Sequence, residues 1–84
     1  MSDREIIEFI KEYFVSTFEI PEAQIKPEAH LAEDLGLDSI EALDMSAMLE
    51  DELDIQISEE ALKGIRTIED VIVFIRENAA HNLN

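Results

Sequence analysis

The chain has 84 residues, and 21 aspartates and glutamates against 6 lysines and arginines give it a net charge of −15 at neutral pH. A chain of this length encloses one hydrophobic core and leaves little for a catalytic cleft between lobes, so we expect a single domain spanning residues 1–84. The charge excludes nucleic acid as a partner, because its phosphates would be repelled, and favours encounter with basic surfaces. A role in keeping the protein soluble would explain this net charge equally well.

Hydrophobic residues make up 46% of the chain and recur at regular spacing, so we expect a folded protein despite 32% charged residues. The longest apolar runs, such as Val71 to Ile75, are far shorter than the roughly 20 residues that span a bilayer, and stable membrane insertion is not expected. The N-terminus is charged and has no apolar signal core, and cysteine is absent. We therefore expect a cytoplasmic protein.

The first predicted element is an amphipathic helix over residues 3–18. Ser2 and Glu5 have the spacing of a capping box, which marks a helix start. Apolar residues then recur at three- and four-residue spacing, as one helix face requires: Ile6, Ile7, Ile10, Phe14 and Phe18.

A long ordered loop is predicted over residues 19–37. The helical period is lost there, Pro21 and Pro27 interrupt the backbone, and only Ile20, Ile25, Leu31 and Leu35 remain to anchor the segment. Loops longer than about 12 to 15 residues in compact domains are more often functional than idle.

Three further helices are predicted after the loop. The first covers residues 39–53, with Asp38 as its cap and Glu41 in its first turn. A short one begins after Ser58 and ends near Gly64. The last is opened by Thr67 with Asp70 and runs to about Ala79, and residues 81–84 should fray. We therefore predict an all-α bundle of three principal helices and one short helix, with the long loop between the first and second helices.

The second predicted helix has two different apolar faces. At about 100° per residue, one side collects Ala42, Met45, Leu49 and Leu53, the natural core face. The opposite side mixes apolar and acidic residues, namely Ile40, Leu43 and Ala47 with Glu41, Asp44, Glu50 and Asp51. Because a solvated face usually lacks such apolar members, this mixture favours a surface for a partner. Met48 lies near the acidic edge, where its flexible side chain could either contact a partner or fill a gap in the core.

Ser39 is the residue with the clearest chemical potential. A nucleophilic serine needs an adjacent base, yet the two histidines are His30 in the loop and His81 in the tail, and the Gly-x-Ser-x-Gly turn of hydrolases is absent. We therefore expect no enzyme. A hydroxyl in the first turn of a helix can instead carry a phosphate ester, which the backbone N–H groups and the helix dipole stabilise. Without further signals, an Asp38-Ser39 pair at a helix start would indicate helix capping and nothing more.

The sequence Glu33-Asp34-Leu35-Gly36-Leu37-Asp38-Ser39-Ile40 resembles the attachment motif of acyl carrier proteins, in which Asp-Ser-Leu follows a glycine loop and opens the second helix. The resemblance covers nearly the whole chain. It extends to the acidic second helix over 41–52, the stretch 53–57, the short third helix and the start of the last helix over 65–71.

This resemblance implies a modified carrier without catalytic residues or a metal of its own. A phosphopantetheinyl transferase, served by Mg²⁺, would move phosphopantetheine from coenzyme A onto Ser39, and the terminal thiol of the arm would carry acyl groups as thioesters. Acyl-transfer, synthase and other acyl-processing enzymes of fatty acid, lipid or polyketide-type biosynthesis would then act on a monomeric carrier.

Two sets of residues receive roles from the resemblance. Basic patches of the partner enzymes would dock on Asp38, Ile40, Glu41, Leu43, Asp44, Ala47, Glu50 and Asp51. The acyl chain would fold back among Met45, Leu49, Leu53, Ile57, Leu62, Ile65 and Ile68, which an ordinary core explains as well.

Several positions depart from the pattern of the family. Ile40 replaces the commoner leucine after the serine, and Ala47 and Ser46 stand where larger aliphatic residues are common. The stretch 13–15 is bulkier than expected. These departures leave open whether the chain is a housekeeping fatty-acid carrier or a specialised one.

Two other functions compete with this interpretation. A calcium-binding EF-hand loop fails on spacing, because placing Gly36 or Gly64 at the central glycine leaves Leu31 or Ala61 where ligands belong. An acidic module that only occupies a basic cleft remains an alternative. Modification of Ser39 would distinguish a carrier from both.

Overall fold

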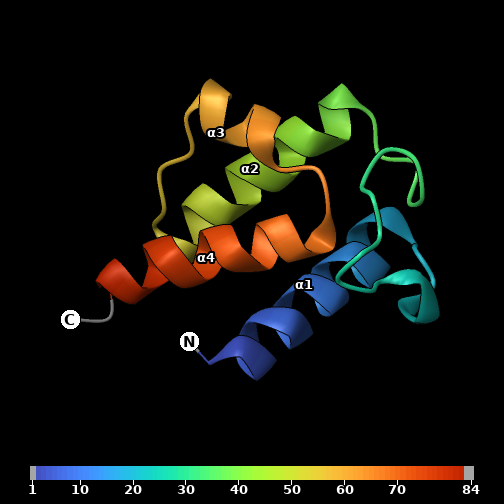
Figure 1. The fold of residues 1–84 in the computed structure, drawn as a ribbon, viewed down its shortest axis with the longest axis horizontal. Helices are drawn as coiled ribbons and strands as arrows, with labels where there is room; N and C mark the ends of the chain where they lie inside the picture. Colours follow the sequence, from blue (N-terminus) through green and yellow to red (C-terminus); the bar gives the residue numbers. More distant parts are fainter. Residues whose placement is uncertain (1, 83–84) are drawn as a thin grey trace.

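The computed structural model describes residues 2–82, with the side chains of 79–82 left undescribed. Figure 1 shows four α-helices: α1 (Asp3–Phe18), α2 (Ser39–Leu53), α3 (Glu59–Gly64) and α4 (Ile68–Asn82). A short 3-10 helix, η1 (Glu22–Gln24), lies in the loop between α1 and α2. Residues 2–82 contain no strand, and an isolated bridge pairs His30 with Thr67. The predicted all-α class is thus confirmed.

The helices begin where their capping residues predict. The Glu5 N–H donates to Ser2 Oγ at 3.2 Å while the Ser2 N–H donates to Glu5 Oε1 at 2.9 Å, which closes the predicted capping box of α1. Ser58 Oγ accepts from the Ala61 N–H at 3.1 Å at the start of α3. Each of these bonds satisfies a backbone N–H that has no partner within the helix.

The core forms where α1, α2 and α4 meet. α4 packs against α1, and the ion pair between Arg76 Nη1 and Asp3 Oδ2, at 3.1 Å, joins the same two helices at the surface. Burying a side chain such as isoleucine or phenylalanine contributes about 1.5–3 kcal/mol. The side chains at 2% exposure or less come from all three helices: Ile6, Ile10, Phe14, Met45, Leu49, Ile68, Val71 and Ile75.

The loop between α1 and α2 is tied to the segment before α4. The Leu31 N–H donates to the carbonyl of Arg66 at 2.8 Å, and the Ile68 N–H donates to the carbonyl of Ala29 at 3.0 Å. The predicted anchors Ile20, Ile25 and Leu31 are buried, as are Ala29 and Leu37, whereas Leu35 is half-buried. These contacts hold the loop against the end of the bundle where α2 starts, at the right of Figure 1.

The end of α4 corrects the prediction from the sequence. The sequence places its end near Ala79, but the helix continues to Asn82, while fraying of residues 81–84 stays a prediction. No glycine or proline follows Glu77, and Ala79 and Ala80 are strong helix formers. Residues 83–84, also included in that prediction, lie outside the described residues. No helix within 2–82 is long and apolar enough to cross a membrane.

Candidate functional site

Ser39 stands at the first position of α2, after a tight turn. Gly36 has φ +73°, in the left-handed region that glycine adopts without steric cost. Its N–H donates to the carbonyl of Ala32 at 3.1 Å, and the next N–H, of Leu37, donates to the carbonyl of Leu31 at 2.9 Å. Leu37 is buried, and the chain then emerges so that Ser39 is exposed.

Asp38 caps the helix that Ser39 opens. The Glu41 N–H donates to Asp38 Oδ1 at 2.9 Å, and the Asp38 N–H donates to Glu41 Oε1 at 3.1 Å. The Asp38 carbonyl accepts from the Ala42 N–H at 2.9 Å. This capping box fixes the backbone on both sides of Ser39 and leaves its hydroxyl at the surface.

A pocket of about 350 Å³ opens beside Ser39. It lies between the loop, the start of α2 and the segment joining α3 to α4. Its apolar lining residues are Leu31, Ala32, Leu37, Ala42, Met45 and Ile65, and His30, Asp38 and Arg66 add polar groups. The pocket thus joins an exposed hydroxyl to an apolar hollow.

His30 lines this pocket, yet its ring is committed to the loop. Nδ1 accepts the N–H groups of Ala32 and Glu33, each at 3.1 Å, which places a ring proton on Nε2. Nε2 lies 3.5 Å from Glu33 Oε2. With both nitrogens engaged, His30 is not a general base for Ser39, and the site lacks the serine–base pair that nucleophilic catalysis requires.

The seven residues proposed for an acyl space fall into three groups. Met45 and Ile65 line the pocket beside Ser39. Leu49 and Ile68 are almost completely buried, while Leu53, Ile57 and Leu62 are half-buried against the same core. The loop residues Leu31 and Leu37, which line the pocket, were not among the candidates, because only the folding of the loop brings them there.

The eight residues proposed for docking share the outer face of α2 and the turn before it. Ile40 is 76% exposed and Leu43 is 57% exposed, although both are large and apolar. Asp44, Ala47 and Asp51 are also exposed, and Glu41 is half-buried. Glu50 is exposed as well.

The Glu50 carboxylate also has a structural role that its position in the sequence does not reveal. Its Oε2 accepts the N–H of Ile57 at 3.1 Å, which ties the segment after α2 back to the helix. α2 contains five acidic residues and no basic one, so its outer face combines two exposed aliphatic side chains with concentrated negative charge.

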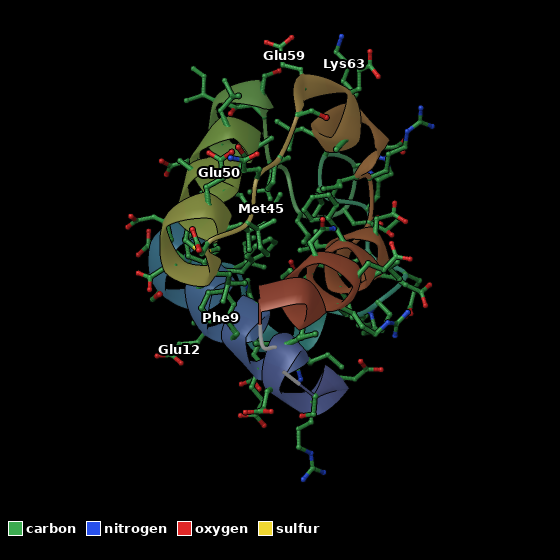
Figure 2. All side chains as sticks on the ribbon, turned by 90° about the vertical axis from the view of Figure 1, so that its left-hand side faces the viewer. Phe9, Glu12, Met45, Glu50, Glu59 and Lys63 are labelled. Carbon is green, nitrogen blue, oxygen red and sulfur yellow. The ribbon has the colours of Figure 1, made fainter. Side chains whose placement is uncertain are left out.

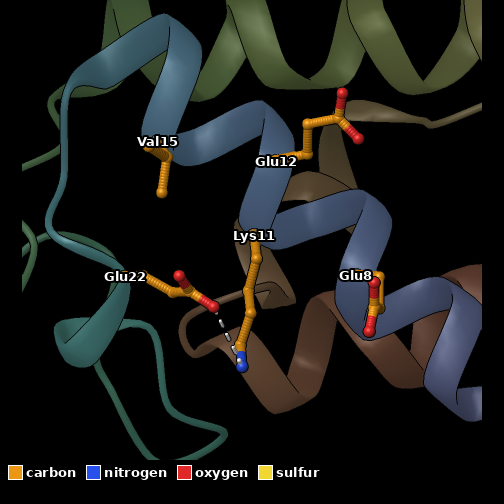
Figure 3. A pocket seen from close by; sticks show the side chains of 5 residues that line it. All are labelled: Glu8, Lys11, Glu12, Val15 and Glu22. Atoms are coloured by element: carbon orange, nitrogen blue, oxygen red, sulfur yellow. Dashed lines mark ion pairs between the residues drawn. The ribbon is translucent and has the colours of Figure 1, made fainter.

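A second hollow, on the outer side of α1, has a different character. Figure 3 shows Glu8, Lys11, Glu12, Val15 and Glu22 around it, with Lys11 Nζ 4.0 Å from Glu22 Oε1. Four of these five side chains are charged, so the hollow is unsuited to an acyl chain. Among the described residues, no group of three or more histidines, aspartates and glutamates is arranged to hold a metal ion.

Comparison with known proteins identifies the family. Residues 8–75 match the family described as "Phosphopantetheine attachment site". The chain belongs to the acyl carrier protein family. A curated relative, "Acyl carrier protein 2" from Ralstonia nicotianae, is 43% identical over 72 residues, which cover 86% of this chain and 89% of the relative.

Membership of this family defines the general function. The protein is an acyl carrier, not an enzyme, and phosphopantetheine is its covalently attached prosthetic group. As a carrier it interacts with acyl-processing enzymes.

Proposed function

We propose that Ser39 is the attachment site of phosphopantetheine and that the outer face of α2 presents the modified carrier to its partner enzymes. The observation that carries the proposal is the position of Ser39: an exposed hydroxyl, fixed at a helix start, beside an apolar pocket. A transferase can reach such a hydroxyl without unfolding any part of the carrier.

The start of α2 suits the phosphate of the arm. Asp38 takes the N–H groups of Glu41 and Ala42, so those of Ser39 and Ile40 remain for a phosphate oxygen. The positive end of the helix dipole acts in the same direction. Arg66, which lines the pocket beside Ser39, adds a positive charge close to the attachment point.

The arm supplies the thiol that the chain lacks, and acyl groups are carried on it as thioesters. Coenzyme A is the donor, and Mg²⁺ serves the transferase. The residues of the carrier only hold, shield and present the cargo.

The apolar pocket beside Ser39 supports the proposal that the acyl chain binds there. Met45 and Ile65 form part of its wall, and the almost fully buried Leu49 and Ile68 belong to the core behind it. The half-buried Leu53, Ile57 and Leu62 extend the same core. Because these side chains also hold the bundle together, entry of a longer chain requires them to move apart.

The acidic face of α2 supports docking to basic surfaces. Ile40 and Leu43 provide exposed apolar area, and Asp44 and Asp51 provide charge beside it. Asp38, Glu41 and Glu50 already bind backbone N–H groups of the carrier itself. We therefore assign the main ionic contacts with partner enzymes to Asp44 and Asp51. That the carrier is monomeric and cytoplasmic stays a prediction.

The test is the intact mass of the folded chain after incubation with coenzyme A, Mg²⁺ and a broad-specificity phosphopantetheinyl transferase. The wild type and Ser58→Ala, which changes another serine at a helix start, should each gain one arm. Ser39→Ala should gain none. A wild type that stays unmodified, or a Ser39→Ala variant that gains the arm, would contradict the proposal.

A further inference from the structure

A groove of about 230 Å³ lies between α1 and α2, apart from the pocket beside Ser39. Phe9, Tyr13 and Met48 are half-buried and form its apolar floor, and the exposed Glu12 and Glu52 stand at its rim. Figure 2 shows Phe9 and Glu12 on α1, below α2.

The floor of the groove is held in place by aromatic contacts. The ring of Tyr13 lies 5.7 Å from that of Phe14 and 5.4 Å from that of Phe18, both in edge-on geometry. Phe14 is 1% exposed and belongs to the core. This packing holds the Tyr13 ring in place, so that part of the groove is preformed. A side chain that enters the groove does not have to order the ring first.

The groove continues the acidic face of α2. Burial raises the pKa of Tyr13, and the charge of Asp44, on the docking face, raises it further. Met48 and Glu52 are themselves α2 residues, so the groove and the docking face share one helix.

The groove has the chemistry that a long basic side chain requires. None of the described residues that line it is basic. Lys11, the lysine of α1, instead pairs with Glu22 in the hollow on the outer side of that helix (Figure 3). Arginine and lysine lay their methylene stems on apolar surface and extend the charged head to carboxylates. Aromatic rings add a cation–π attraction.

We propose that this groove receives an arginine or lysine side chain of the enzymes that dock on α2, so that the docking surface extends from α2 onto α1. The inference rests on the proposed function, because it assumes docking on α2. A second copy of the chain is a poor occupant, since two molecules of net charge −15 repel one another.

The test compares charge reversal at two neighbouring turns of α1. Glu12→Lys places a positive charge at the rim, whereas Glu8→Lys makes the same change on the same helix at a residue that does not line the groove. With the phosphopantetheinyl transferase as probe at low ionic strength, Glu12→Lys should raise KM about tenfold, equivalent to about 1.4 kcal/mol. Glu8→Lys should raise KM about twofold or less, because it alters only the long-range field. Both variants should keep kcat and the circular dichroism spectrum of the wild type.

A second measurement does not depend on variants. In a titration of the isotope-labelled chain with the transferase in the absence of coenzyme A, the amide signals of Phe9, Glu12 and Ser16 should shift together with those of α2. Equal KM values for the two variants, or shifts confined to α2, would overturn the inference while the mass gain at Ser39 still supports the proposed function. Absence of that mass gain in the wild type would instead overturn the proposed function. If the chain formed dimers at high concentration and the amide signals of the groove shifted with dimer formation, the groove would bind a second copy of the chain. That result would also overturn the inference.

Discussion

In the first turn of α2, the Asp38 carboxylate accepts the backbone N–H of Glu41 at 2.9 Å, and the Glu41 carboxylate accepts that of Asp38 at 3.1 Å. Ser39 lies between them in the sequence, with its side chain exposed. The two carboxylates therefore fix the local backbone while the hydroxyl takes no part in the cap. The serine proposed to carry the arm therefore opens the helix without using its hydroxyl to cap it.

This cap should be measurable as stability. Asp38→Ala removes the acceptor for the Glu41 N–H and should lower the free energy of unfolding by about 1 kcal/mol. Asp38→Asn should lose much less, because asparagine caps about as well as aspartate. Urea unfolding followed by circular dichroism gives both values. An equal loss in the two variants would show that charge, and not capping, is the contribution of Asp38.

The two glycines should respond in opposite directions to alanine. A Cβ added at either Gly36 or Gly64 would meet no atom within 4 Å, so crowding does not distinguish them. Gly36 has φ +73°, and alanine there should cost about 1–2 kcal/mol. Gly64 ends α3 without a positive φ, and alanine should stabilise the fold by about 0.4–1 kcal/mol. Thermal and urea unfolding would disprove this if both variants changed in the same direction.

Leu43 and Leu49 lie on the same helix but should separate docking from stability. Leu49 is 0% exposed, and Leu49→Ala should lower the free energy of unfolding by about 2–5 kcal/mol. Leu43 is 57% exposed, and Leu43→Ala should change that free energy by no more than about 0.5 kcal/mol. Leu43→Ala should instead raise KM for the transferase by about tenfold. An unchanged KM would remove Leu43 from the docking face.

Asp70 should contribute stability that disappears in acid. The Arg66 N–H, donating at 3.0 Å, and the Thr67 N–H, donating at 3.1 Å, hold the pKa of Asp70 below its usual 3.8, against an opposing effect of burial. Since the folded-state pKa is the lower one, ionised Asp70 stabilises the fold above the unfolded-state pKa. That contribution is lost as pH falls through the folded-state value.

The comparison with Asp70→Asn isolates this group from the other carboxylates. The difference in unfolding free energy between wild type and variant should be constant from neutral pH to about pH 5 and should shrink below about pH 4. Denaturant unfolding at a series of pH values provides the curve. A difference that stays constant, or grows, as the solution becomes acidic would contradict the role assigned to Asp70.

Much of this fold could be predicted because its signals are local. Ser2, Asp38 and Ser58 mark helix starts through hydrogen bonds that span three residues, and the structure confirms all three. The end of α4 and the helix η1 were missed. Alanines after Glu77 allow the helix to continue, and η1 depends on the carbonyl of Pro21 accepting the Gln24 N–H.

The surroundings of Ser39 were harder to predict because they depend on distant contacts. The pocket wall needs the loop near Leu31 to bind the carbonyl of Arg66, and nothing in either local pattern indicates that pairing. Periodicity correctly separated the buried Met45 and Leu49 from the exposed Leu43. It could not show which buried residues line a pocket and which only fill the core.

The central claim is tested most directly by locating the arm at the level of single residues. The chain contains serines at five positions, Ser2, Ser16, Ser39, Ser46 and Ser58. Fragment-ion mass spectrometry of the carrier isolated from its own cells should find one phosphopantetheine, on the peptide containing Ser39 and on that side chain. An arm on any other residue, or a Ser39 peptide found only in unmodified form, would contradict the account.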